Sequence, residues 1–172
     1  MLILSAADAV DTIAWNVGGS FDGFNDLMNA KAKSLGMMGT HFDNAVGADM
    51  SSGFEDIYTT ASDLAKLAVA FMKNSTLRSI VAKTEYTTST GFAVDGVKIQ
   101  NWNLLLTDAY KSEQFTCTGI KTGNTDDAGQ CLAASGMDEN GQEYIVIVLG
   151  VDKRASCAEQ AKKMLEWAFL ND

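Results

Sequence analysis

Residues 114–135 read QFTCTGIKTGNTDDAGQCLAAS, two strand-like stretches around a turn made of Asn, Asp and Gly. These turn-forming residues predict an antiparallel hairpin. A continuous apolar run, EYIVIVLGV at 143–151, is typical of a central strand. The next segment, CAEQAKKMLEWAFL at 157–170, has helical periodicity. Its apolar stripe consists of Ala161, Met164, Leu165 and Ala168. Three antiparallel strands followed by a helix predict a helix packed on a sheet.

The first half of the chain, residues 1–83, has the pattern of helices. Three expected helices begin at residues that cap helix N-termini well, namely Ser5, Ser20 and Thr60. A fourth, short helix is expected to begin at Ser75. The glycines expected to end the first two helices are Gly18, Gly19 and Gly36.

The second half of the chain, residues 84–151, reads mainly as strands. Within it, Asp95-Gly96 predicts a two-residue hairpin turn between the arms FAV and VKI. A single domain of the α+β class follows: helical over 1–83, stranded over 84–151, and closed by a C-terminal helix within 152–172.

The composition excludes several classes of partner. The chain has 172 residues, 47% of them apolar and 20% charged, which is typical of a globular domain. Its net charge of -9 would repel the phosphates of nucleic acid and an anionic membrane surface. No apolar run reaches the roughly 18 residues of a membrane-spanning helix. The start, MLILSAAD, lacks the basic residues of a signal peptide and reads like the end of a buried helix. We therefore expect the natural domain to begin upstream.

Cysteine and histidine predict neither a metal site nor a cofactor. The three cysteines are widely spaced, which fits neither a zinc site nor a disulfide framework. Cys131 is expected to be a buried thiol, and a Cys117–Cys131 bridge across the hairpin remains open. His41 is the only histidine, without ligand-spaced partners, and is expected to be a structural hydrogen-bonding residue.

Lys121 has three readings: a phosphate loop, part of a serine-enzyme site, or a surface lysine before a turn. A phosphate loop needs glycines where Phe115 and Ile120 stand, and it should lead into a helix rather than a strand. It is therefore excluded. A lysine followed by Thr122 and Gly123 suits an anion site, because the ammonium, the hydroxyl and an accessible backbone can all contact a ligand.

The segment TGIKTGNTDDAGQCLAAS resembles the Lys-Thr-Gly strand and turn of the low-mass penicillin-binding proteins, the serine-type D-alanyl-D-alanine carboxypeptidases. Other segments resemble the same family: FNDLMNAKAKSLGMMGTHFDNAVGAD, YTTASDLAKLA, NWNLLL and MLEWAF. The resemblance runs over nearly the whole chain. It implies a β-lactamase/transpeptidase-like fold, present here without the nucleophile helix and the first strands.

The resemblance also implies roles for the Lys-Thr-Gly residues. Lys121 and Thr122 would hold the terminal carboxylate of a substrate, and Gly123 would let it approach the strand. The backbone N–H of Asn124 would form half of the oxyanion hole, where charge develops during acyl transfer.

The family's second motif, Ser-x-Asn, falls on Ser5-Ala6-Ala7. Ser5 matches, whereas Ala7 replaces the asparagine and cannot hydrogen-bond a substrate through its side chain. For Ser5 two readings stay open: a helix cap together with Asp8, and a proton relay with Lys121.

The family's first motif, Ser-x-x-Lys, carries the acylated serine, and no serine of this chain has a lysine three positions on. Covalent catalysis needs such an activated nucleophile. We therefore expect an N-terminally truncated carboxypeptidase that is inactive alone. The parent enzyme would trim terminal D-alanine from peptidoglycan stem peptides, bind β-lactams and act outside the membrane after export. An alternative is a natural, non-catalytic relative that binds peptidoglycan peptides or a protein. An exposed sheet edge would favour self-association.

Overall fold

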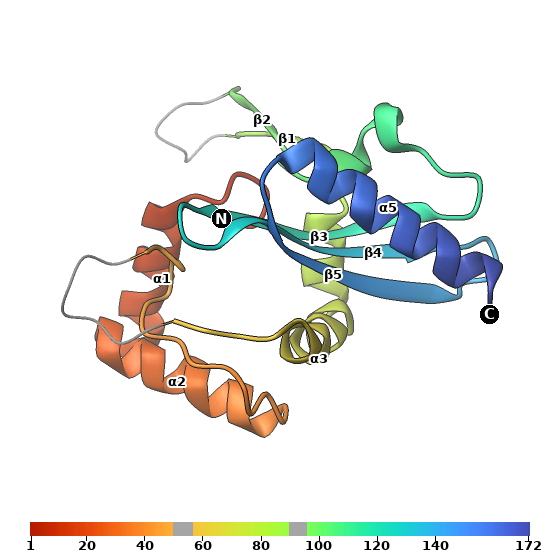
Figure 1. The fold of residues 1–172 in the computed structure, drawn as a ribbon. Helices are drawn as coiled ribbons and strands as arrows, with labels where there is room; N and C mark the ends of the chain where they lie inside the picture. Colours follow the sequence, from red (N-terminus) through yellow and green to blue (C-terminus); the bar gives the residue numbers. More distant parts are fainter. Residues whose placement is uncertain (50–56, 90–95) are drawn as a thin grey trace.

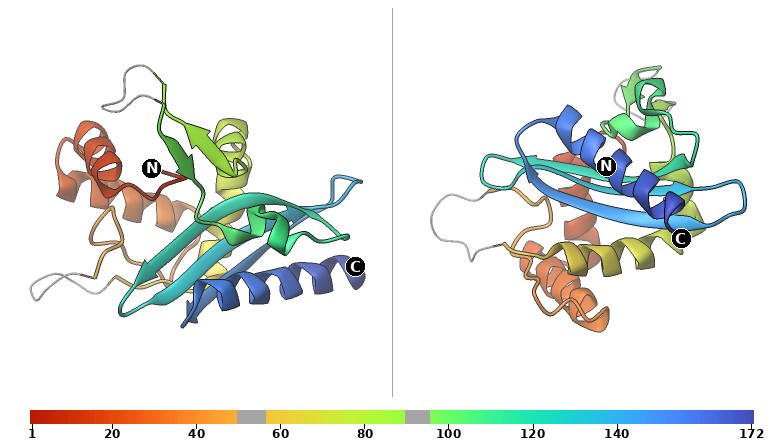
Figure 2. Two further views of the ribbon diagram at one scale, coloured as in Figure 1. Left: turned by 90° about the horizontal axis from the view of Figure 1, so that it is seen from above. Right: turned by 45° about the vertical axis from the view of Figure 1, so that its right-hand side comes forward.

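The computed structural model describes residues 1–49, 57–89 and 96–172. Helices dominate the first half of the chain, and three long antiparallel strands with a C-terminal helix follow (Figure 1). The α+β class predicted from the sequence is confirmed. One face of the sheet is covered by helix α5 and the other by α3 and α4 (Figures 1 and 2).

The main sheet of the described residues contains β3 (Thr116–Thr125), β4 (Gly129–Met137) and β5 (Glu143–Val151) in the order β3-β4-β5. The expectation that the apolar run at 143–151 would be a central strand is wrong, because β5 is an edge of this sheet and β4 is its centre. The apolar run instead reflects burial from both faces, since α3 and α5 both pack on β5.

Helix α5 (Arg154–Leu170) forms the larger core with the sheet. Ala161 and Leu165 are fully buried there, as the expected stripe requires. Met164 is 45% exposed and lies outside the contact, so that part of the stripe was wrong. The side chains buried in this core include Leu132, Ala134, Val146, Val148, Cys157 and Ala158.

Helices α3 (Ala61–Met72) and α4 (Ser75–Val81) pack on the opposite face. The approach of α4 to β3 depends on Gly119, whose φ is +133°. A Cβ atom added to this glycine would lie 2.7 Å from a methyl carbon of Val81. Only glycine therefore fits at this position.

A partly buried ion pair also fixes α4 on the sheet. The Arg78 guanidinium donates two hydrogen bonds to the Glu143 carboxylate, at 2.7 and 2.5 Å. The Thr118 hydroxyl donates to the same carboxylate at 2.9 Å and is also hydrogen-bonded to Ser135, which is fully buried. This network joins α4 to all three strands.

Helices α1 (Ala7–Gly18) and α2 (Phe21–Ser34) pair with each other, beside the end of the sheet that carries the β3–β4 turn (Figure 1). The predicted caps at Ser20 and Thr60 are confirmed, because each side chain accepts a hydrogen bond from the backbone N–H three residues on. The predicted cap at Ser5 is wrong: α1 begins after Ala6 and has no side-chain cap. The glycines expected to end α1 and α2 are confirmed by the positive φ of Gly19 and Gly36.

A short hairpin of β1 (Glu85–Thr87) and β2 (Lys98–Gln100) lies beyond α4. The expected two-residue turn at Asp95-Gly96 falls partly outside the described residues. The expected FAV arm also lies outside the described residues. The expected VKI arm pairs with residues 86–88, because Lys98 and Ile99 lie opposite Thr87 and Tyr86 and the N–H of Thr88 donates to the carbonyl of Val97 at 2.9 Å.

Candidate functional site

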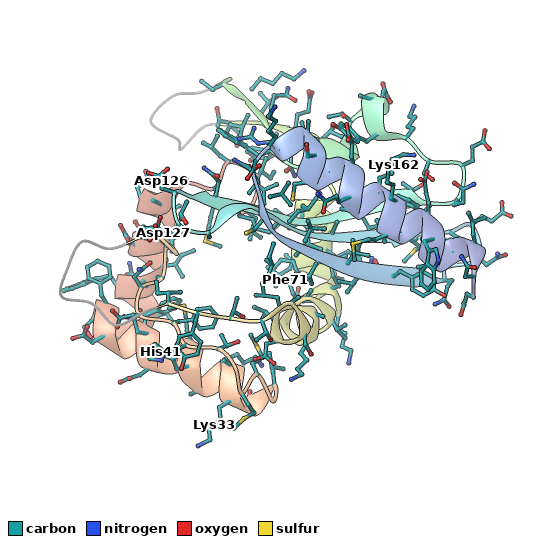
Figure 3. The ribbon with its side chains drawn as sticks, viewed as in Figure 1. Lys33, His41, Phe71, Asp126, Asp127 and Lys162 are labelled. Atoms are coloured by element: carbon teal, nitrogen blue, oxygen red, sulfur yellow. The ribbon has the colours of Figure 1, made fainter. Side chains whose placement is uncertain are left out.

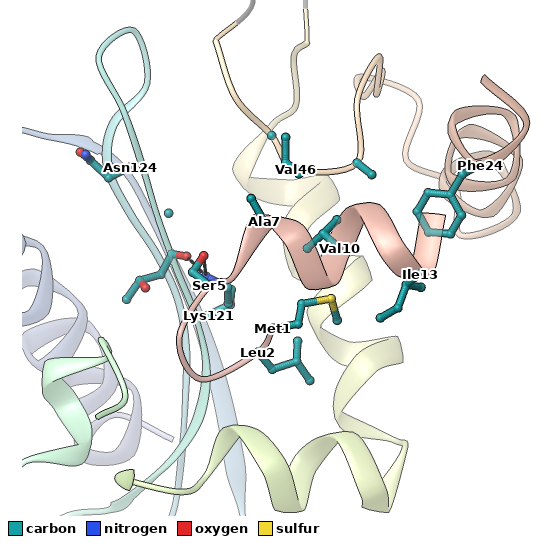
Figure 4. A pocket seen from close by; sticks show the side chains of 14 residues that line it. Met1, Leu2, Ser5, Ala7, Val10, Ile13, Phe24, Val46, Lys121 and Asn124 are labelled. Carbon is teal, nitrogen blue, oxygen red and sulfur yellow. Dashed lines mark hydrogen bonds between the residues drawn. The ribbon is translucent and has the colours of Figure 1, made fainter. Parts of the chain in front are cut away.

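Ser5 and Lys121, 116 positions apart in the chain, meet where the start of α1 faces β3 (Figure 4). The Lys121 ammonium donates to Ser5 Oγ at 2.8 Å and also to the backbone carbonyl of Thr122. The residues matched to the family's second and third motifs are thus in direct contact. This is the contact that a proton relay between the two side chains would need.

A tight turn at the N-terminus places Ser5. Its backbone N–H donates to the carbonyl of Met1 at 2.7 Å, and its φ is +59°, an uncommon value for a residue with a side chain. Leu2 packs against the core of α3, α4 and β3. This turn therefore directs the Ser5 hydroxyl toward Lys121 rather than toward the backbone of α1. For this reason Ser5 does not cap the helix.

The environment of Lys121 leaves its positive charge available. The side chain is half-buried, and burial lowers the pKa of its ammonium from the ordinary value. No carboxylate of the described residues forms an ion pair with it. A half-buried cation without an acidic partner attracts an anionic ligand, which would also offset the cost of burial.

Two cavities meet at the Lys-Thr-Gly strand. One, of about 510 Å³, lies between this strand and α1 (Figure 4). The other, of about 300 Å³, lies toward the start of α5. The residues that line both are Ser5, Thr122, Gly123 and Asn124. Every site residue predicted around Lys121 therefore lines a cavity, and Ala7 lines the larger one.

The outer wall of the larger cavity is the segment 45–47, which the sequence analysis did not identify as part of the site. This segment is held at both ends. On one side Asn29 exchanges two hydrogen bonds with the backbone of Phe42. On the other, the Asp49 carboxylate accepts from the N–H of Asp127 in the β3–β4 turn at 3.0 Å, which lowers the Asp49 pKa. Figure 3 labels Asp126 and Asp127, which lie in the turn between β3 and β4.

Arg154 and Trp102 line the smaller cavity, and neither was predicted from the sequence. The Arg154 guanidinium carbon lies 4.2 Å from the centre of the Trp102 ring. None of the described carboxylates forms an ion pair with Arg154. The structure shows a mismatch at this position, because Arg154 is the first residue of α5 and a basic residue is unfavourable beside the positive end of the helix dipole.

A threonine, Thr118, does stand three positions before Lys121, in the spacing of an activated nucleophile. Its hydroxyl is hydrogen-bonded to Ser135 and Glu143, and it does not line either cavity. Thr118 is therefore part of the sheet network rather than of the site. At the position of the second-motif asparagine, Ala7 presents only a methyl group (Figure 4).

The cysteines take no part in the site. The strand register pairs Cys117 with Gly136 and Cys131 with Gly123, and all three thiols are free, so the open possibility of a Cys117–Cys131 bridge is excluded. Cys131 is half-buried, less than expected, because it lies near the hairpin end of β4. Burial raises the Cys117 pKa to about 11, which keeps this thiol neutral. No cluster of potential metal ligands occurs among the residues that the structure describes.

The sequence profile of the D-alanyl-D-alanine carboxypeptidase family, peptidase S11, matches residues 1–153. The chain belongs to this family. It is 32% identical over 165 residues to D-alanyl-D-alanine carboxypeptidase DacA of Escherichia coli strain K12, covering 96% of this chain and 38% of DacA. It is 27% identical to the DacA of Haemophilus influenzae, covering 99% of this chain and 40% of that protein.

Solved structures of the family share the fold. Penicillin-binding protein D2 of Listeria monocytogenes, in its cefotaxime-bound form, matches with a TM-score of 0.81 at 28% identity, over 99% of this chain and 64% of that one. The Streptomyces K15 DD-transpeptidase matches with a TM-score of 0.83 at 27% identity, over 98% and 64%. The chain thus spans about 40% of the length of these DacA relatives. No helix of the described residues is long and apolar enough to cross a membrane.

Proposed function

We propose that these 172 residues form the carboxylate-recognition part of a serine D-alanyl-D-alanine carboxypeptidase and that they bind, without cleaving, peptides ending in D-alanyl-D-alanine. One observation carries the proposal. In a chain with a net charge of -9, two cations that form no ion pair with the carboxylates of residues 1–49, 57–89 and 96–172, Lys121 and Arg154, flank the cavities at Thr122. Such an arrangement favours a carboxylate, which accepts hydrogen bonds from an ammonium, a guanidinium and a hydroxyl together.

The division of roles follows from the geometry and the family. Lys121, Thr122 and Arg154 would bind the terminal carboxylate, and Gly123 would leave room for the peptide along β3. The N–H of Asn124 would contribute to the oxyanion hole of the parent enzyme. Ser5, bonded to Lys121, would pass a proton between the lysine and the substrate. The parent enzyme would remove the terminal D-alanine of peptidoglycan stem peptides in the cell envelope.

The proposal includes the absence of catalysis by this polypeptide alone. Acylation needs a nucleophilic hydroxyl with a base beside it, and the chain has no Ser-x-x-Lys sequence. We expect no release of D-alanine and no covalent labelling by a fluorescent penicillin. A labelled band on a denaturing gel would contradict this part of the proposal.

Binding is tested by calorimetry with a diacetylated lysyl-D-alanyl-D-alanine peptide and the same peptide carrying a C-terminal amide. We expect the acid to bind more tightly by roughly 10- to 150-fold, because a charge-assisted contact contributes about 1.5–3 kcal/mol. Lys121→Met should reduce this difference, and the double variant Lys121→Met/Arg154→Met should remove it. Lys111→Met is the matched control, since Lys111 is exposed and pairs with Asp108 outside the site. Equal binding of acid and amide by the wild type would refute the proposal.

A second candidate is a natural, non-catalytic relative that binds peptidoglycan peptides or a protein. Ala7 favours it, because the loss of the motif's amide weakens catalysis whatever else the protein contains. Ala7→Asn restores the amide at the mouth of the larger cavity. Tighter peptide binding by this variant would support a lost catalytic residue, and unchanged binding would support adaptation of the site to another ligand.

The outer edge of β5 is a candidate surface for self-association. The strand is apolar, and no described strand pairs with this edge. An unprotected edge of this kind promotes pairing between chains. Sedimentation at increasing protein concentration tests it: a mass that rises to that of a dimer or larger supports pairing, and a monomer throughout refutes it.

A further inference from the structure

The Asn101-Trp102-Asn103 stretch uses its two amides to fix the backbone. The Asn101 side chain donates to the carbonyls of Val81 and Lys83, and its oxygen accepts from the N–H of Asn103. Asn103 is 1% exposed, and its side-chain oxygen accepts a hydrogen bond from the backbone N–H of Leu105. The backbone on both sides of Trp102 is therefore held, while the residue is 43% exposed and lines the smaller cavity.

The contact between Trp102 and Arg154 orients the guanidinium without neutralising it. The guanidinium carbon lies 4.2 Å from the ring centre, within the range of a cation–π contact. A carboxylate partner would also have fixed the arginine, but it would cancel the charge and compete with an anionic ligand. An aromatic face avoids both effects, because it attracts the cation while leaving its N–H donors directed outward.

We propose that Trp102 is a positioning residue that holds the Arg154 guanidinium over the smaller cavity, so that it meets a carboxylate beside Thr122. The role in binding rests on the proposed function, whereas the orientation of Arg154 is a property of the free protein. An arginine side chain loses considerable rotamer freedom when it is immobilised on a ligand. Trp102 restricts that freedom before the ligand arrives, and it acts through Arg154 rather than by touching the substrate.

The orientation is tested by NMR of the arginine side chains. The chain has only two arginines, and Arg78, fixed by its pair with Glu143, is an internal reference. In the wild type we expect a ring-current displacement of the Arg154 Hε signal. Trp102→Leu should abolish the displacement, Trp102→Phe should keep part of it, and Arg78 should not change. Trp167→Leu, at a 69% exposed tryptophan of α5, is the matched control. An Arg154 signal unaffected by Trp102→Leu in a folded protein would overturn the proposal.

The effect on binding is measured with the same acid and amide peptides. We expect Trp102→Leu to weaken binding of the acid about three- to tenfold and Trp102→Phe to weaken it less, in line with a cation–π contact plus lost preorganisation. In an Arg154→Ala background, Trp102→Leu should have no further effect. If it still weakens binding there, Trp102 acts on the ligand directly and the proposal fails. If the wild type shows no preference for the acid, the proposed function fails, and the NMR comparison alone decides the positioning of Arg154.

Discussion

Replacing Glu143 by alanine should destabilise the protein by about 2–3 kcal/mol, and the reason lies in the pair with Arg78. The Glu143 side chain is 17% exposed and that of Arg78 is 30% exposed. Exposed ion pairs contribute about 0–1 kcal/mol, whereas breaking a buried pair costs about 3–5 kcal/mol. A half-buried, bidentate pair belongs between these limits. The variant also leaves the Thr118 hydroxyl without one of its acceptors.

Chemical denaturation followed by circular dichroism measures this loss. For a domain of this size, about 2–3 kcal/mol corresponds to a fall in melting temperature of roughly 4–12 °C. Glu139→Ala is the control, since that carboxylate is exposed in the turn before β5. Its replacement should change the unfolding free energy by less than about 0.5 kcal/mol.

A double-mutant cycle with Arg78→Ala isolates the pair from the other contacts. We expect a coupling free energy of about 1–2 kcal/mol between the two positions, because each single variant leaves the other charge without its partner. A Glu143→Ala variant as stable as Glu139→Ala, or a coupling near zero, would refute the conclusion that this pair fixes α4 on the sheet.

Three further predictions concern other parts of the fold. Gly119→Ala should cost about 2–4 kcal/mol in thermal unfolding, because its positive φ and the contact with α4 leave no room for a methyl group; a cost below about 1 kcal/mol would argue against that close contact. The hydrogen bond from Lys66 lowers the pKa of the Asp63 carboxyl below 3.8, so its stabilising contribution is present above that pH and is lost as the pH falls further. Asp63→Asn should therefore flatten the loss of stability between about pH 5 and pH 2.5 in urea titrations, and an unchanged pH profile would contradict this assignment. Iodoacetamide should alkylate the half-buried Cys131 before Cys117, whose pKa is raised to about 11 by burial, as mass spectrometry of digests would show; the reverse order would refute the assigned environments.

Local chemistry made the helices and the hairpin predictable. Ser20 and Thr60 cap their helices, because each side chain accepts a hydrogen bond from the backbone N–H three residues on. Ser5 has the same local pattern but does not cap α1. Its hydroxyl accepts a hydrogen bond from the ammonium of Lys121, which lies 116 positions further along the chain. The position of β5 in the sheet could not be predicted from local sequence either. An apolar run indicates that a strand is buried on both faces, but it does not show whether the strand is central or at an edge.

Some residues of the candidate site could be predicted from local sequence and others could not. Lys121, Thr122, Gly123 and Asn124 are consecutive, so a motif could identify them. Trp102 and Arg154 are separated by 51 intervening residues and meet only through the fold. Their functional signal is a mismatch: a cation at the positive end of α5 is locally unfavourable, and such an exception to local rules is expected at a functional site.

Among the residues that the structure describes, the partners of the two site cations are all uncharged or aromatic. Lys121 is bonded to the Ser5 hydroxyl and to a backbone carbonyl, and Arg154 lies on the Trp102 ring. Neutral partners fix the positions of both cations while leaving their charge uncancelled at Thr122. An acid placed beside either cation should therefore reduce peptide binding even where it improves stability, and this expectation distinguishes a binding site from a structural cluster.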